Sequence, residues 1–252
     1  MSQLRLLLPE IGRVAILSVQ VARAFVRPPI EWRPLIYQID HAGMRSWSIT
    51  VLTAIFTGMV MALQFATGRE PYGASMYTGK LVALGIVREL GPVLTALLVG
   101  GRVGSGFAAE LGSMAVTEQV DAIRALGADP VKKLVAPRVL ACIIAIPLLT
   151  MLADLIGCFG GMIITTREVG VTPRFFYQQI LDTLWVEDLI HGLAKSVFFG
   201  YAIGIVGCYV GINTTGGTEG VGQATTRSVV ATAVTLLISN FLLTQLFLAI
   251  YG

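Results

Sequence analysis

Charged residues are scarce in this chain of 252 residues: aspartate, glutamate, lysine and arginine make up 13% of it, whereas 55% is hydrophobic. A soluble domain carries about a quarter charged residues, and the mean hydropathy of this chain is high, at +0.77. So few charges cannot cover the surface of a soluble globule of this length, and the surplus hydrophobic surface must face lipid. The composition therefore excludes an ordinary soluble domain and predicts an integral membrane protein.

Cysteine and histidine are also rare, with three and two residues. Cys142, Cys158 and Cys208 lie in hydrophobic runs without the spacing of metal ligands, so we expect reduced thiols and neither a metal nor a disulfide. His41 and His191 lie far apart, and no catalytic triad or paired-carboxylate motif stands out. The sequence G-x-x-x-x-G-K-[ST] is absent, so the chain should not bind ATP through a P-loop. We predict a non-catalytic protein without cofactor, metal or nucleic-acid partner.

Long hydrophobic runs predict an all-α fold with about five transmembrane helices and no internal repeat. Each run is close to the roughly 20 residues that cross the hydrocarbon core. The predicted spans are residues 47–65, 81–102, 139–164, 189–212 and 228–251. The segment 32–45 is predicted to be a polar, cytoplasmic approach to the first span. The segment 165–188 is polar with aromatic residues and is predicted to be a loop or short helix at the membrane interface.

An amphipathic helix is predicted at the N-terminus, over residues 10–27, since Ile11, Val14, Val21 and Phe25 share one helical face. It could lie in the membrane interface or pack on protein; the pattern alone fits both. Residues 1–45 thus form an interfacial helix with a cytoplasmic approach segment, and 46–252 form the transmembrane domain.

Lysine and arginine are distributed unevenly about the spans, which predicts the orientation. With a cytoplasmic N-terminus, the cytoplasmic side holds Arg5, Arg13, Arg23, Arg27, Arg33, Arg45, Arg124, Lys132, Lys133, Arg138 and Arg227. The other side then holds Arg69, Lys80, Arg167 and Arg174. We therefore expect the N-terminus inside the cell and, after five spans, the C-terminus outside.

The stretch from Arg88 to Arg138 organises the chain. A membrane helix leads into a glycine-rich run, in which Gly100, Gly101, Gly104 and Gly112 form small-residue ridges suited to helix–helix or dimer packing. A short charged helix follows at about 117–126. Thr117 should cap it, and Gly127 and Pro130 should end it. Such a helix between two spans could be a lever for a partner protein or a solvated loop helix.

Arg88 and Glu89 fall inside the second span, where a charge is costly unless it is paired or hydrated. They could form a polar wall for the head group of an amphiphile, or an ion pair that locks helices together. Adjacent residues point about 100° apart on a helix, so we expect one to line a cavity and the other to hold a neighbouring helix. At the end of the first span, Met61, Gln64 and Phe65 would suit an acyl chain with a polar head, or ordinary helix packing.

Several motifs in order resemble MlaE-type permeases, the membrane subunits of ABC transporters that move phospholipids with mammalian-cell-entry (MCE) proteins. The motifs are RELGPV, GRVGS, AAELG, TEQ-DAI and DP…PR, with GMVMALQ upstream and ATTRSVV downstream. The resemblance covers roughly residue 45 to the C-terminus.

The resemblance implies a homodimer in the bacterial inner membrane, two cytoplasmic ATPase subunits that bind the ATP, a periplasmic ring of MCE-domain protein, and an outward-opening lipid cavity at the dimer centre. It implies that Gln64, Tyr72 and Glu89 border this cavity, with Met61 and Phe65 beside them, and that Arg227 is a cytoplasmic anchor. The coupling helix that sits in the ATPase would present Glu118, Gln119, Asp121, Ala122, Arg124 and Ala125.

We therefore expect a permease subunit that moves phospholipids or related hydrophobic molecules. One alternative is an ion-coupled secondary transporter that uses Arg88, Glu89, Asp154 and Lys195, which are ionisable residues within spans. Another is a scaffold that anchors other envelope proteins.

Overall fold

The computed structural model describes residues 2–26, 32–67 and 77–251, and these are helical with short connections and no strand. Three short segments interrupt or join the α-helices: the 3₁₀ turn η1 (Met44–Ser46) and the π-helical segments η4 (Ile86–Leu90) and η5 (Val131–Val135). The α-helices are α1 (Ser2–Val26), α2 (Trp32–Ala42), α3 (Trp47–Thr67), α4 (Thr78–Gly85), α5 (Gly91–Val116), α6 (Gln119–Ala125), α7 (Ala136–Glu168), α8 (Pro173–Thr183), α9 (Val186–Ile212) and α10 (Gly217–Tyr251).

The described residues contain 5 helical stretches long and apolar enough to cross a membrane. They run over Trp32–Ala66, Thr78–Val116, Val131–Glu168, Val186–Ile212 and Gly217–Ile250. The prediction of an all-α membrane protein with five spans is confirmed. The chain is a multi-pass membrane protein.

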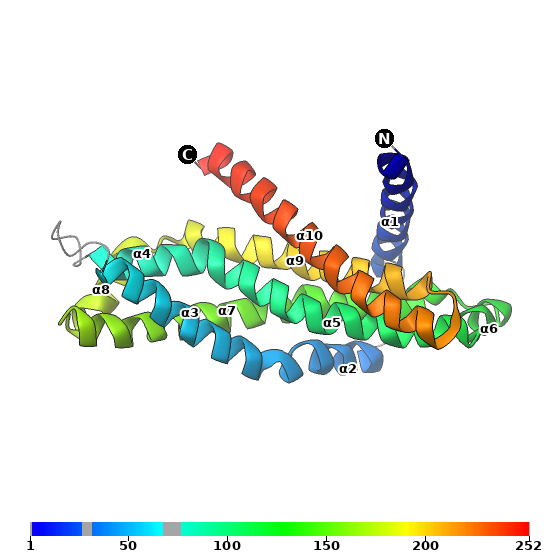
Figure 1. Cartoon of the computed structure of the whole chain (residues 1–252), viewed down its shortest axis with the longest axis horizontal. Helices are drawn as coiled ribbons and strands as arrows, with labels where there is room; N and C mark the ends of the chain where they lie inside the picture. The colour runs from blue at the N-terminus through cyan, green and yellow to red at the C-terminus, as the bar shows by residue number, and fades with distance from the viewer. Residues whose placement is uncertain (1, 27–31, 68–76, 252) are drawn as a thin grey trace.

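The helix α5 lies at the centre of the bundle and packs on α7, α9 and α10 (Figure 1). The main core joins these elements through large side chains that are fully buried, among them Phe107, Ile146, Phe199 and Ile203. Glycines bring the backbones close: a Cβ at Gly207 would lie 2.9 Å from the carbonyl oxygen of Gly104. In a membrane, where lipid is as apolar as a leucine side chain, such close packing holds helices together.

One predicted boundary is wrong. The second span does not end at Arg102, because α5 continues to Val116 and contains the whole glycine-rich run. Glycine costs about 1 kcal/mol in an isolated helix, but here the glycines lie against α9 and α10, and packing outweighs the propensity. The predicted approach segment, 32–45, contains the helix α2, and α3 begins at Trp47, where the first span was predicted to begin. Arg102 of α5 donates to the carbonyl of His41 at the end of α2 (3.1 Å) and to the hydroxyl of Ser46 (2.9 Å).

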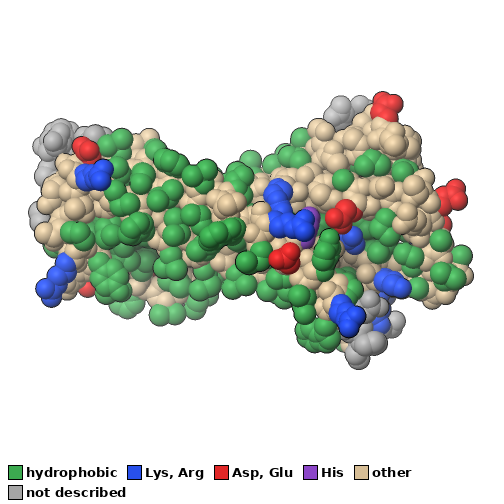
Figure 2. All heavy atoms as spheres, turned by 90° about the horizontal axis from the view of Figure 1, so that it is seen from below, with side chains coloured by type: hydrophobic (Ala, Val, Ile, Leu, Met, Phe, Trp, Pro, Cys, Tyr) green, Lys and Arg blue, Asp and Glu red, His purple; other side chains and the backbone are tan. Residues whose placement is uncertain are grey.

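The helix α1 runs across the long axis of the bundle, and α10 diverges from the bundle toward the C-terminus (Figure 1). Leu17 and Val21 of α1 are buried against the core, whereas Ile11, Ile16 and Val19 are exposed. This placement fits a helix that lies in the plane of the membrane interface. Hydrophobic side chains cover one half of the face seen in Figure 2, and charged side chains lie at its end and on the other half.

Candidate functional site

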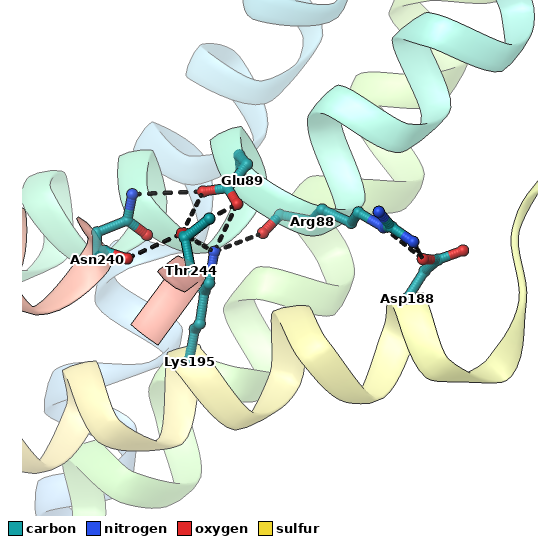
Figure 3. A network of polar contacts seen from close by, with 6 residues as sticks. All are labelled: Arg88, Glu89, Asp188, Lys195, Asn240 and Thr244. Atoms are coloured by element: carbon teal, nitrogen blue, oxygen red, sulfur yellow. Dashed lines mark hydrogen bonds and ion pairs between the residues drawn. The ribbon is translucent and has the colours of Figure 1, made fainter. Parts of the chain in front are cut away.

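A network of polar side chains lies within the spanning helices, at the π-helical segment η4 (Figure 3). It joins Arg88 and Glu89 of η4 to Asp188 and Lys195 of α9, and to α10. Asp188 and Lys195 are seven residues apart on α9, which places them on about the same helical face, two turns apart. The two adjacent charges of η4 therefore each meet an opposite charge on one neighbouring helix.

Lys195 is the most buried member of this polar network, with a side chain that is 0% exposed. Its Nζ donates to Glu89 Oε1 (2.7 Å), to Thr244 Oγ1 (2.7 Å) and to the backbone carbonyl of Arg88 (3.2 Å). An ammonium group has three N–H donors, so all three are used. The π turn changes the backbone hydrogen-bond pattern at this level, and the Arg88 carbonyl accepts from a side chain of another helix.

Glu89 connects the same network to α10. Thr244 Oγ1 lies 3.1 Å from Glu89 Oε1, and Asn240 Nδ2 donates to Glu89 Oε2 at 3.4 Å. Thr244 Oγ1 also lies 2.9 Å from the carbonyl of Asn240, so its single proton serves one acceptor at a time. The Glu89 side chain is 35% exposed and retains room for a further donor.

Arg88 forms an ion pair with Asp188, which is 1% exposed, while the arginine side chain is 44% exposed. Asp188 Oδ2 also accepts from the backbone N–H of Trp185 (2.9 Å) at the start of α9, where a carboxylate is favoured by the helix dipole. We expected one of Arg88 and Glu89 to hold a neighbouring helix and the other to line a cavity. The structure shows that both residues pair with α9, and that both side chains are also partly exposed.

The other residues expected at a lipid cavity lie on α3. Met61 and Phe65 are half-buried and pack on a small cluster formed by Ala62, Val82 and Ile86, whereas Gln64 is exposed. Tyr72 lies outside the described residues. The helix α3 packs mainly on α7, while α10 packs on α5 and α9. Among the residues that the structure describes, no hydrogen bond or ion pair joins Met61, Gln64 or Phe65 to the polar network. Their membership of one cavity stays a prediction.

The predicted small-residue positions divide into two groups. Gly100, Gly104 and Gly112 are buried: a Cβ at these positions would lie 3.1 Å from Ile203, 3.4 Å from Ser228 and 3.1 Å from Thr214, respectively. The Ser228 hydroxyl donates to the Gly104 carbonyl (2.9 Å). Gly101 has no neighbouring atom within 4 Å of its Cβ position. Three of the four glycines thus serve packing within the chain.

The short helix α6 projects from the end of the bundle opposite α8 (Figure 1). Val120 is buried and anchors it, and the predicted coupling residues are exposed: Glu118, Gln119, Asp121, Ala122, Arg124 and Ala125. Asp121 and Arg124 pair along the helix at 2.8 Å. Gly127 has the left-handed φ of +77° expected after a helix.

Thr117 does not cap α6, so that prediction is wrong. Its hydroxyl lies 2.7 Å from the Ser113 carbonyl and closes the end of α5. Glu118 takes the position before α6 with a left-handed φ of 59°, and its side chain forms no capping hydrogen bond. The chain reverses direction sharply between α5 and α6, and Glu118 adopts this conformation at the turn. The backbone turn therefore determines which residue precedes α6, although threonine is the better N-cap residue.

The sequence did not identify Asp188, Asn240 or Thr244 as members of the polar network. A usable signal was present for Asp188: in the apolar run of α9, Asp188 and Lys195 stand seven residues apart and match the opposite charges at Arg88 and Glu89. Asp154, proposed with them as part of an ion path, has no ion pair among the residues that the structure describes. The ion-coupled alternative therefore has no continuous chain of ionisable groups in the described part of the molecule.

Comparison with known proteins identifies the family. The sequence model of the family described as "Permease MlaE" matches residues 35–246. The chain belongs to the MlaE permease family. A probable ABC transporter permease protein of Rickettsia felis is 39% identical over 238 residues, which is 94% of this chain and 92% of that protein. A probable ABC transporter permease protein of Synechocystis is 41% identical over 230 residues, which is 91% of this chain and 88% of that protein.

A plant relative of this MlaE-family chain is the chloroplastic protein trigalactosyldiacylglycerol 1 of Arabidopsis thaliana, which is 36% identical over 234 residues, or 93% of this chain and 67% of that protein. The family and these relatives make the chain an ABC transporter permease, and a permease of this class requires an ATPase partner.

Proposed function

We propose that this MlaE-family permease moves phospholipid, or a related hydrophobic molecule, between the bacterial inner membrane and a periplasmic assembly of MCE-domain protein. ATP hydrolysis takes place in a separate cytoplasmic subunit, and this chain is non-catalytic. The observation that carries the proposal is the polar network of η4, α9 and α10: Arg88 and Glu89 keep exposed surface at membrane depth, next to helices whose outward side chains are apolar. A polar patch within apolar walls fits a lipid, which has a charged head and hydrocarbon chains.

The exposed surface of α10 supports a homodimer. Most of its side chains are not buried within the single chain, and Leu237, Phe241 and Leu242 are all more than half exposed. An open groove of about 470 Å³ between α5 and α10 is lined in part by Ser105, Gly106 and Ala109, small residues that let a second helix approach closely. Two copies related by this surface would bring both polar networks toward one central cavity.

The exposed face of α6 supports the contact with the ATPase. The helix is short, and the buried side chain of Val120 anchors it to the bundle. Its acidic and basic side chains are exposed, so a cytoplasmic partner can bind them without disturbing the core. This assignment places α6 and the N-terminus in the cytoplasm and the C-terminus in the periplasm. The uneven distribution of lysine and arginine supports that orientation.

The test is transfer of a fluorescent phospholipid by the purified complex in proteoliposomes. We expect transfer that needs ATP and the co-purified ATPase, and that falls at least tenfold when the ATPase is inactivated. Transfer by the permease alone under a proton gradient would instead favour the ion-coupled mechanism. A complex that holds lipid but never moves it would favour the scaffold.

A further inference from the structure

A second, apolar cavity of about 350 Å³ lies between η4, α7, α8 and α9. Its volume falls within the range of small-molecule pockets, about 300–1,000 Å³. It is on the half of the bundle away from α6 (Figure 1). Its walls include Leu155 and Phe159 of α7, Phe176 and Ile180 of α8, and Leu193 of α9. Val87 of η4 and Leu189 of α9 also line it, next to Arg88 and Asp188 in the chain, but no side chain of the polar network is among its lining residues.

Asp154 carries the one carboxyl group among the side chains that line this cavity. It stands near the middle of α7, a helix that crosses the membrane. Its Oδ1 is buried without a hydrogen-bond partner, and no ion pair of the described residues includes it. An unpaired carboxyl group at this depth is costly, and residues of this kind are usually functional.

The neighbouring backbone leaves room for this carboxyl group. A Cβ at Gly91 would collide with Asp154 Oδ1, so glycine at this position allows the close approach. The fold therefore accommodates the acid and does not pair it. This oxygen is buried against Gly91, while Asp154 also lines the cavity, so a ligand there can pair with the carboxyl group.

We propose that this cavity binds a single-chain hydrophobic amine. Its ammonium group would donate to Asp154, and its hydrocarbon chain would pack on Leu155, Phe159 and Ile180. A plain hydrocarbon chain would leave the carboxyl group unpaired, and a phosphate head would place negative charge beside it, whereas an ammonium group stabilises its ionised form. The carboxyl group of Asp154 thus favours an ammonium head over the phosphate head of the phospholipid that we propose as transport substrate, and the two sites differ in ligand class.

The test uses the full transporter with its ATPase, in nanodiscs of phosphatidylcholine, which carries no net charge and does not concentrate cations. A dodecylamine with a diazirine in its chain is the photoactivatable probe. We expect it to label peptides of α7, α8 and α9. We expect unlabelled dodecylamine to compete at about tenfold lower concentration than dodecyl methyl ether, which has the same chain but no donor, since a hydrogen bond to a charged group is worth about that factor.

Two variants make the result specific. Asp154→Leu should remove the difference between the two competitors, and Leu193→Trp should fill the cavity and abolish labelling. Asp154→Asn, which keeps the shape of the side chain, should retain labelling but reduce the preference for the amine. Equal competition by amine and ether in the unchanged protein, or labelling that falls on none of η4, α7, α8 and α9, would overturn the proposal. Binding is measured without transport, so this result is independent of the transport experiment.

Discussion

The ion pair between Glu89 and Lys195 should make a measurable contribution to stability, because the lysine has no access to solvent. In the variant Glu89→Gln, Lys195 keeps its hydrogen bonds to Thr244 and to the Arg88 carbonyl but loses the one carboxylate that pairs with it in the described part of the chain. Breaking a buried pair costs about 3–5 kcal/mol. Glu89 is 35% exposed, so water can replace part of the lost interaction, and we expect a loss of roughly 2–3 kcal/mol.

The reverse change, Lys195→Met, leaves a carboxylate that still contacts Thr244, Asn240 and water. We therefore expect a smaller loss, about 1–2 kcal/mol. The double variant removes both charges, and its loss should be smaller than the sum of the single losses by at least about 1 kcal/mol. Unfolding of the purified chain in detergent, followed by circular dichroism across a denaturant series, measures each value.

A matched control is Asp121→Asn in α6, since its pair with Arg124 joins two side chains that are 69% and 58% exposed. Exposed pairs contribute little, and the unfolding free energy should change by less than about 0.5 kcal/mol. If the losses of unfolding free energy at Glu89 and Lys195 were additive, or as small as in this control, the polar network would not stabilise the contact of η4 with α9 and α10.

Four further results are expected. Gly200→Ala, whose new Cβ would collide with the backbone of α7, should lower the free energy of unfolding by about 1–3 kcal/mol, whereas Gly101→Ala, with nothing within 4 Å, should not lower it. Glu118→Gly should raise it by about 0.5–1 kcal/mol, because the left-handed φ of 59° strains a residue with a Cβ. Asp121→Lys should abolish lipid-stimulated ATPase activity of the complex while membrane insertion is retained; unchanged activity would argue against α6 as the coupling helix. Gln64→Arg should reduce crosslinking of a photoactivatable phospholipid several-fold, and full crosslinking would remove Gln64 from the lipid path.

The number of spans and the position of α6 could be predicted from the sequence because both depend on local pattern. Hydrophobic runs of sufficient length specify the spans, and Gly127 with Pro130 marks the end of a helix near residue 126. The end of the second span could not be predicted in the same way. Glycines Gly100 to Gly112 look like a helix end, and only the packing of α9 and α10 against them explains why α5 continues.

The partners of the charged residues could not be predicted from local sequence patterns either. Arg88 and Asp188 are 100 residues apart in the chain, and Glu89 and Thr244 are 155 apart. The π-helical turn η4 adds a second difficulty, since the regular spacing of an α-helix places adjacent side chains on different faces. Both charges reach a partner because α9 presents two residues, two turns apart, along the length of η4.

The most direct test of the central claim is to map where a transported phospholipid touches this chain. A phospholipid with a photoactivatable group close to its phosphate, bound to the complex in nanodiscs, should label residues of η4, α9 and α10 around Glu89 and Lys195. Labelling confined to the outer surface of α3 and α7, and unaffected by Glu89→Gln, would contradict the account.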